Sequence, residues 1–109
     1  MIIGVAGPYS APTSAERKAN LDALNEVAAR LLEQGHIPLI GVNMALPVLL
    51  KADVPDRYSA TMAMSLALIG ACEGLLLLAE SPGANKERDL VLSKGLPVYL
   101  RIEDVPAAR

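Results

Sequence analysis

One short segment combines small turn-forming residues with a carboxylate that could perform chemistry. Ser81-Pro82-Gly83-Ala84-Asn85 directly precedes Lys86 and Glu87. A turn of this kind at the start of a helix presents backbone N–H groups to an anion or a sugar hydroxyl. We expect these groups and the helix dipole to hold Glu87 ionised, as a nucleophile or a base at neutral pH. The same pattern also fits an ordinary N-cap by Ser81 or Asn85, with Glu87 only complementing the dipole.

A second candidate segment is the loop Gly7-Pro8-Tyr9-Ser10, which follows an apolar run. It is either a ligand-binding loop or a tight turn that carries a partly exposed tyrosine. Other phosphate motifs are missing, since the sequence has no G-x-x-x-x-G-K-[ST] and the spacing of Gly4 and Gly7 does not fit G-x-G-x-x-G. The single His36 has no Ser or Cys nucleophile motif beside it, so we interpret it as a surface or packing residue.

Alternating strand and helix signals must position these segments. Short apolar runs predict strands over residues 2–6, 37–42, 74–79 and 97–102. Helical spacing predicts a helix that begins after Thr13, with Glu16 completing a capping box, and ends at Gly35. Two further helices are predicted over 58–71 and 84–94. Pro38 favours an edge position for the second strand, and residues 43–56, with Pro47 and Pro55, are expected to form a loop with one or two helical turns.

This β-α-β-α-β-α-β order predicts the fold class. With right-handed crossovers it generates an α/β, doubly wound, flavodoxin-like three-layer sandwich with a parallel sheet in strand order 2-1-3-4, to which a short fifth strand could be added. The crevice of such a sheet opens between the carboxyl ends of strands 1 and 3. Those ends are the loop 7–10 and the segment 80–83. Both candidate segments are therefore predicted to form one site.

Composition limits the classes of protein to which this chain can belong. Its 109 residues suffice for a single domain, 1–109. A net charge of -2, with no stripe of Lys or Arg, disfavours binding to nucleic acid. One Cys and one His form neither an internal disulfide nor a metal cage, and the apolar start MIIGVAG is too short for a signal peptide or a membrane span. We expect a cytoplasmic protein without metal, cofactor or membrane partner.

Taken together, five groups of residues resemble the nucleoside 2-deoxyribosyltransferase family over nearly the whole chain. The resemblance is strongest to its short members, which include the 2′-deoxynucleoside 5′-phosphate N-hydrolases. The residues that carry it are Gly7-Pro8-Tyr9-Ser10, Arg17 with Asn20, Gly35-His36-Ile37-Pro38, Ala71-Cys72-Glu73, and Ser81-Pro82-Gly83-Ala84 with Glu87.

The resemblance implies a retaining attack on the N-glycosidic bond of a nucleoside or a nucleoside 5′-monophosphate. Glu87 would be the nucleophile, and water or a second base would resolve the glycosyl-enzyme. Ser81 stands where the family's nucleotide hydrolases have a serine that helps to bind the 5′-phosphate. The remaining site residues that it implies are Tyr9 for catalysis and Gly7, Pro8, Ser10, Ser65, Glu80, Gly83 and Ala84 for substrate binding.

One departure from the family concerns proton transfer. Eight residues before Glu73 the family usually has an Asp, and here the residue is Ser65, while Glu73 itself stands where an Asp is usual. Protonation of the leaving base then lacks an obvious donor. Either Tyr9 or Glu80 replaces it, or the protein is a non-catalytic module that binds a nucleotide or ribosyl ligand.

The predicted helix 58–71 also indicates self-association. Its segment ATMAMSLALIGA, residues 60–71, carries no charge and is apolar on all sides, which is typical of a helix buried on all sides. We expect a homodimer that forms through this helix. The alternative is that residues 43–56 fold over its outer face. In the family that the chain resembles, partner subunits also complete the active site.

Overall fold

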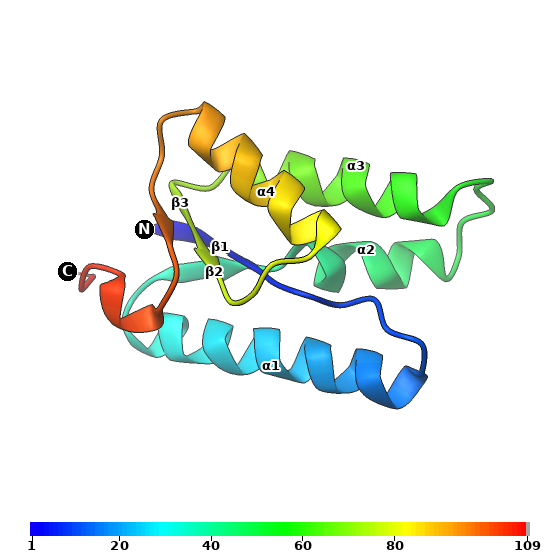
Figure 1. Ribbon diagram of the computed structural model, residues 1–109, viewed down its shortest axis with the longest axis horizontal. Coiled ribbons are helices and arrows are strands. Elements are labelled where there is room, and N and C mark those ends of the chain that lie inside the picture. The colour runs from blue at the N-terminus through cyan, green and yellow to red at the C-terminus, as the bar shows by residue number, and fades with distance from the viewer. Residues whose placement is uncertain (109) are drawn as a thin grey trace.

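The apolar runs of the sequence form a four-stranded, fully parallel sheet, which gives the predicted fold class and strand order. In the computed structural model, which describes residues 1–108, the order is β2-β1-β3-β4. The strands are β1 (Ile2–Ala6), β2 (Ile37–Leu39), β3 (Gly74–Leu77) and β4 (Val98–Tyr99). Helix α1 (Ser14–Glu33) covers one face of the sheet, and α3 (Arg57–Ile69) and α4 (Pro82–Ser93) cover the other (Figure 1).

Two core clusters fill the space between the sheet and its helices, because alternate strand residues point to opposite faces. On β1, Ile3 and Val5 join the cluster under α1, whereas Ala6 joins the cluster under α3 and α4. On β3, Leu76 faces α1, and its neighbours face the other side. The sheet is therefore buried on both faces, as the consecutive leucines of its central strand predicted.

The helix ends follow the predicted capping signals. Thr13 is the N-cap of α1, and its Oγ1 accepts a hydrogen bond from the Glu16 N–H at 3.1 Å. Gly35, with a φ of 91°, follows the end of the same helix in a conformation that favours glycine. Asp56 caps α3 by accepting from the Ser59 N–H, although this cap was not predicted from the sequence. These local signals fixed the ends of the long helices to within a residue or two.

Several boundaries differ from the prediction, and the third strand, β3, ends at Leu77, two residues earlier than expected. The second strand stops at Leu39, and a helix, α2 (Gly41–Leu49), follows in place of most of the expected loop. The last strand is only two residues long and leads into a short 3₁₀ helix, η1 (Ile102–Asp104). No fifth strand occurs within residues 1–108. Pro38 lies on the edge strand β2, as expected.

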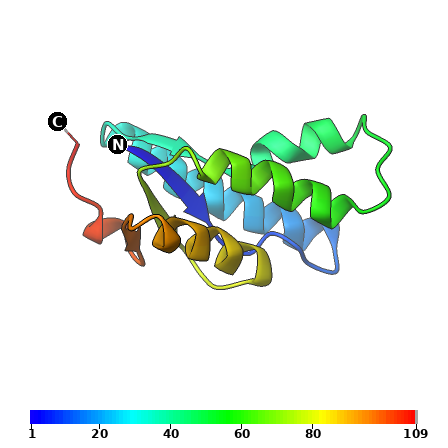
Figure 2. The same cartoon turned by 90° about the horizontal axis from the view of Figure 1, so that it is seen from above.

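Helix α2 forms in spite of Pro47 because tertiary packing supports it. A proline within a helix removes one backbone hydrogen bond and crowds the carbonyl four residues earlier. Ala45 and Leu49 of α2 are nevertheless buried, and α2 and α3 run side by side beyond the end of β1 (Figure 2). Burial of an apolar face outweighs local propensity in many protein helices. The alternative that this segment covers α3 is therefore correct at least for residues 41–49.

His36 is a buried packing residue that links the two ends of the chain. The terminal ammonium of Met1 lies 3.0 Å from Nδ1, and Nε2 lies 2.9 Å from the carbonyl oxygen of Pro106. An ammonium can only donate, so Nδ1 is the acceptor and Nε2–H donates to Pro106. This histidine lies outside the candidate site. Of the helices described, none has the length and apolar character that a membrane crossing requires.

Candidate functional site

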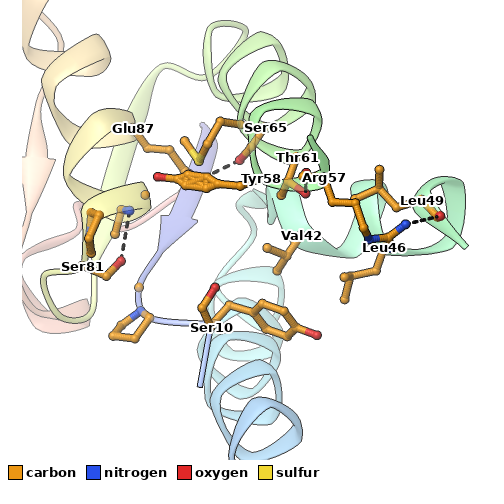
Figure 3. Close-up of a pocket in the computed structure, with 17 residues that line it drawn as sticks. Ser10, Val42, Leu46, Leu49, Arg57, Tyr58, Thr61, Ser65, Ser81 and Glu87 are labelled. Carbon is orange, nitrogen blue, oxygen red and sulfur yellow. Dashed lines mark hydrogen bonds between the residues drawn. The ribbon is translucent and has the colours of Figure 1, made fainter. Parts of the chain in front are cut away.

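A cavity of about 580 Å³ opens at the carboxyl ends of β1 and β3. Its walls come from the loop after β1 and from α2, α3 and the start of α4 (Figure 3). This is the crevice that the strand order predicts. The cavity is lined by Gly7, Pro8, Tyr9, Ser10, Val42, Leu46, Leu49, Arg57, Tyr58, Thr61, Met62, Ser65, Ser81, Pro82, Gly83, Ala84 and Glu87.

The structure thus brings together all but one of the candidate catalytic and substrate-binding residues. The exception is Glu80, which does not belong to the cavity lining. Its side chain is 72% exposed, and its carboxylate accepts a hydrogen bond from Arg88 Nη1 at 3.0 Å. Glu80 lies in the loop between β3 and α4, and its side chain faces solvent. The structure therefore does not support it as a substrate-binding residue or a proton donor.

Glu87 and Ser65 face each other from two different helices. Ser65 Oγ on α3 donates to Glu87 Oε1 on α4 at 3.1 Å (Figure 3). The second carboxyl oxygen, Oε2, is buried and has no hydrogen-bond partner within the described part of the chain. A buried carboxyl oxygen without a partner is costly, and such atoms in native proteins usually have a role. Oε2 therefore keeps unused capacity to accept a hydrogen bond, although it is shielded from solvent.

The protonation state of Glu87 differs from the expectation. Burial raises its pKa to about 7, although the hydrogen bond from Ser65 acts in the opposite direction. The dipole does not hold Glu87 ionised, because Glu87 is the sixth residue of α4 and the dipole effect fades within the first turn. At neutral pH the carboxyl is therefore divided between its acidic and basic forms.

The start of α4 provides fewer donors than the sequence suggested. Ser81 is the N-cap, and its Oγ accepts from the Ala84 N–H at 3.1 Å. The Asn85 N–H bonds to the Ser81 carbonyl, and Pro82 has no N–H. In residues 1–108 no acceptor is found for the Gly83 N–H. The donors available to an anion at the start of α4, here called the cradle, are therefore this N–H and the Ser81 hydroxyl, whose own proton can still be donated.

Helix α1 fixes the loop after β1 from outside the cavity. Asn20 Nδ2 donates to the Tyr9 carbonyl at 3.0 Å, and Arg17 Nη1 donates to the Ala11 carbonyl at 2.8 Å. Both side chains are partly buried. Arg17 and Asn20 thus hold the backbone on which Tyr9 and Ser10 are placed, although they do not line the cavity themselves.

The far wall of the cavity was missed by the sequence analysis. Val42, Leu46 and Leu49 come from α2, which was expected to be mostly loop, and the start of α3 adds Arg57 and Tyr58. Arg57 Nη1 donates to the Leu49 carbonyl at 2.9 Å, and Lys86 Nζ lies 3.3 Å from the Tyr58 hydroxyl. The apolar spacing of residues 42, 45, 46 and 49 is the one signal that could have revealed this wall.

Comparison with known proteins adds no family to these observations. Neither a scan against models of protein families nor a search of curated proteins finds a match to this chain.

Proposed function

We propose that this protein cleaves the N-glycosidic bond of a nucleoside or a nucleoside 5′-monophosphate, as its resemblance to the nucleoside 2-deoxyribosyltransferases implies. The observation that carries the proposal is the carboxyl of Glu87, which lines the cavity and has one oxygen without a partner. Its pKa of about 7 leaves a useful fraction of the nucleophilic carboxylate at neutral pH. The cavity volume of about 580 Å³ lies within the usual range for a small-molecule site.

The proposed reaction proceeds in two displacements at the anomeric carbon, C1′. The Glu87 carboxylate forms a bond to C1′ while the C1′–N bond breaks, and the base leaves with the bonding electron pair and gains a proton. Water then attacks C1′, restores the carboxylate and returns a proton to the donor. A second base attacking in place of water would make the reaction a transfer.

Tyr9 is the proton donor that the geometry supports best. It lines the cavity, and its backbone is held by Asn20. Ser65 lines the same cavity but uses its hydroxyl on Glu87. With Glu80 turned toward Arg88, Tyr9 is the remaining residue of those singled out for this step.

A 5′-phosphate would be held at the start of α4, and we propose the monophosphate as the preferred ligand. Ser81 and the Gly83 N–H can both donate to phosphate oxygens at the positive end of the helix. The Arg57 guanidinium lines the same cavity and adds positive charge to it. The preference for a phosphate therefore needs no lysine-rich loop.

The first experiment measures release of free base from a panel of nucleosides and their 5′-monophosphates. Glu87→Gln keeps the size of the side chain but removes the nucleophile, so base release should fall by at least about a thousandfold. Glu26→Gln, which alters an exposed carboxyl on α1, should retain the wild-type rate. Base release by Glu87→Gln at the wild-type rate would refute the mechanism.

The second experiment measures selectivity for the phosphate by calorimetry. The monophosphate should bind more tightly than the matching nucleoside, and Ser81→Asp should reduce this preference by about tenfold or more, ~1.4 kcal/mol. Ser81→Asn is the matched control, because Asn and Asp both cap helices and only Asp adds a charge. Equal affinity of the wild type for both ligands would argue against the cradle.

A second candidate function is a non-catalytic module that binds a nucleotide or ribosyl ligand. Ser65 in place of an acid favours it, and Glu87 is the only carboxyl among the cavity-lining residues that the structure describes. Such a module would bind a monophosphate in the calorimeter and release no base from any member of the panel. Glu87→Gln would then alter affinity without altering any rate.

A further inference from the structure

Ser65 lies at the contact of three helices and is almost completely buried. Its side chain, on α3, is 1% exposed, and its Oγ donates to Glu87 Oε1 on α4. A serine hydroxyl has one proton, so this bond uses its whole capacity as a donor. Although Ser65 borders the cavity, its polar atom is directed at Glu87.

The start of α2 holds the Ser65 side chain in this position. A Cβ added at Gly41, the first residue of α2, would lie 1.9 Å from Ser65 Oγ and 2.6 Å from Ser65 Cβ. Both distances are far below those of real contacts, so only glycine fits here. Helix α2 therefore packs its backbone directly against the Ser65 side chain.

We propose that Ser65, packed against Gly41, is a positioning residue: its hydroxyl binds Glu87 Oε1 and thereby fixes the orientation of the carboxyl group that attacks the substrate. This inference rests on the proposed function. A free carboxyl group can rotate about its last torsion, whereas one that is anchored through Oε1 keeps a single orientation. A donor to the carboxylate also favours its ionised form, which is the nucleophile.

The other ionisable groups around Glu87 leave this role to Ser65. Helix α2 has no ionisable side chain between Gly41 and Leu49. Tyr9, Arg57 and Tyr58 line the same cavity, with Arg57 bonded to the Leu49 carbonyl. On α4, Lys86 contacts Tyr58, and Arg88 pairs with Glu80 and Asp89.

Cys72 is a further neighbour of Glu87, since the charge of Glu87 acts on its thiol. Burial and the negative charge of Glu87 raise the pKa of its thiol to about 11, so the thiol stays neutral. The groups described around Glu87 therefore supply one hydrogen bond to its carboxyl, and that bond comes from Ser65.

The test is a carbon NMR titration of the Glu87 carboxyl in the free protein, assigned by its loss in Glu87→Gln. Ser65→Ala removes the donor and should raise the midpoint by about 1 pH unit, the shift expected for loss of a hydrogen bond to a charged group. Ser93→Ala, the same change near the end of α4, should leave the midpoint unchanged. In the wild type, the Ser65 Cβ shift should titrate with the midpoint of Glu87.

Two outcomes would overturn the inference. One is an unchanged or lowered Glu87 midpoint in Ser65→Ala. The other is a Ser65 Cβ shift in the wild type that does not follow Glu87, which is a test that needs no variant. Neither requires turnover, so failure of the proposed function would be seen separately as absence of base release. Where base is released, the acid limb of the kcat/KM profile should move upward by the same amount in Ser65→Ala.

Discussion

Burial of the Glu87 carboxyl couples its ionisation to folding. In the unfolded chain the group titrates near 4.5, and in the folded protein burial raises its pKa to about 7. Between these pH values the folded state keeps a proton that the unfolded state has lost, so stability falls as pH rises. The stabilising contribution is complete below pH 4.5 and is lost by the time the pH has passed 7.

This coupling predicts the pH dependence of stability. Between pH 4.5 and pH 8 the wild type should lose about 2 kcal/mol of unfolding free energy relative to Glu87→Gln, which is neutral throughout. This loss is smaller than the full pKa shift would give, because solvent partly screens the side chain. Urea unfolding across this range measures the difference, with Glu26→Gln as the control. Parallel curves for the wild type and Glu87→Gln would contradict it.

At the level of single residues, the sequence placed Glu87 but could not determine its charge. Its position before an apolar helix face is visible in the spacing of residues, and it led correctly to the cavity. Its pKa depends on burial by α3, a segment more than fifteen residues away in the chain, and on the Ser65 hydroxyl. Likewise, the residues next to Glu80 in the sequence do not reveal that its carboxylate pairs with Arg88 and does not line the cavity.

At the level of elements, the contact between α2 and α3 shapes the site. Gly41 allows the two helices to approach until its backbone touches Ser65. Gly41→Ala should therefore lower the unfolding free energy by about 2 kcal/mol or more, since added atoms in a filled core force the surrounding backbone to move. Denaturant unfolding provides the measurement.

Gly70→Ala is a matched control for this prediction. A Cβ at Gly70 would meet only the carbonyl oxygens of Leu66 and Ala67, at 3.2 and 3.4 Å, and the backbone there is helical. Its effect on stability should be well below that of Gly41→Ala. If the two variants were equally stable, the close approach at Gly41 would have no energetic importance.

The sequence predicted the long helices well and α2 poorly, for a physical reason. The helices with clear caps, such as α1 after Thr13 and α3 after Asp56, carry their boundaries in local side-chain hydrogen bonds. Helix α2 has no side-chain cap and contains Pro47, so its local signals argue for a loop. Its stability comes from packing on α3, which a pattern of neighbouring residues does not reveal.

For the whole molecule, the topology predicted where the site lies. A β-α-β-α-β-α-β chain with right-handed crossovers leaves a crevice where the winding reverses, and the cavity is at that place. The predicted location of the site depends only on the order of the elements. The errors in the predicted lengths of the later strands therefore did not affect it. The size and lining of the cavity depend on α2, and these were not predictable from the order alone.

Helix α2 moves the expected dimer contact away from α3, and we still predict a dimer. Helix α3 packs against α2, so part of its apolar surface is covered within the monomer. One group of exposed apolar side chains lies on α2 and just after it, where Val48 is 50% and Leu50 is 80% exposed. Met44 is exposed on the same helix. Burying such a patch against a second copy of itself would remove it from water.

Light scattering at micromolar concentration should therefore give a mass twice the 11.5 kDa of one chain. Val48→Glu places a charge in the middle of the patch and should shift the protein toward the monomer, because an unpaired charge resists burial in an apolar interface. Leu92→Glu alters an equally exposed apolar residue on α4, away from α2, and should leave the mass unchanged. A stable wild-type monomer would refute the dimer. A dimer that Val48→Glu leaves intact would place the contact on another face, and Leu68→Glu would then test the original contact on α3.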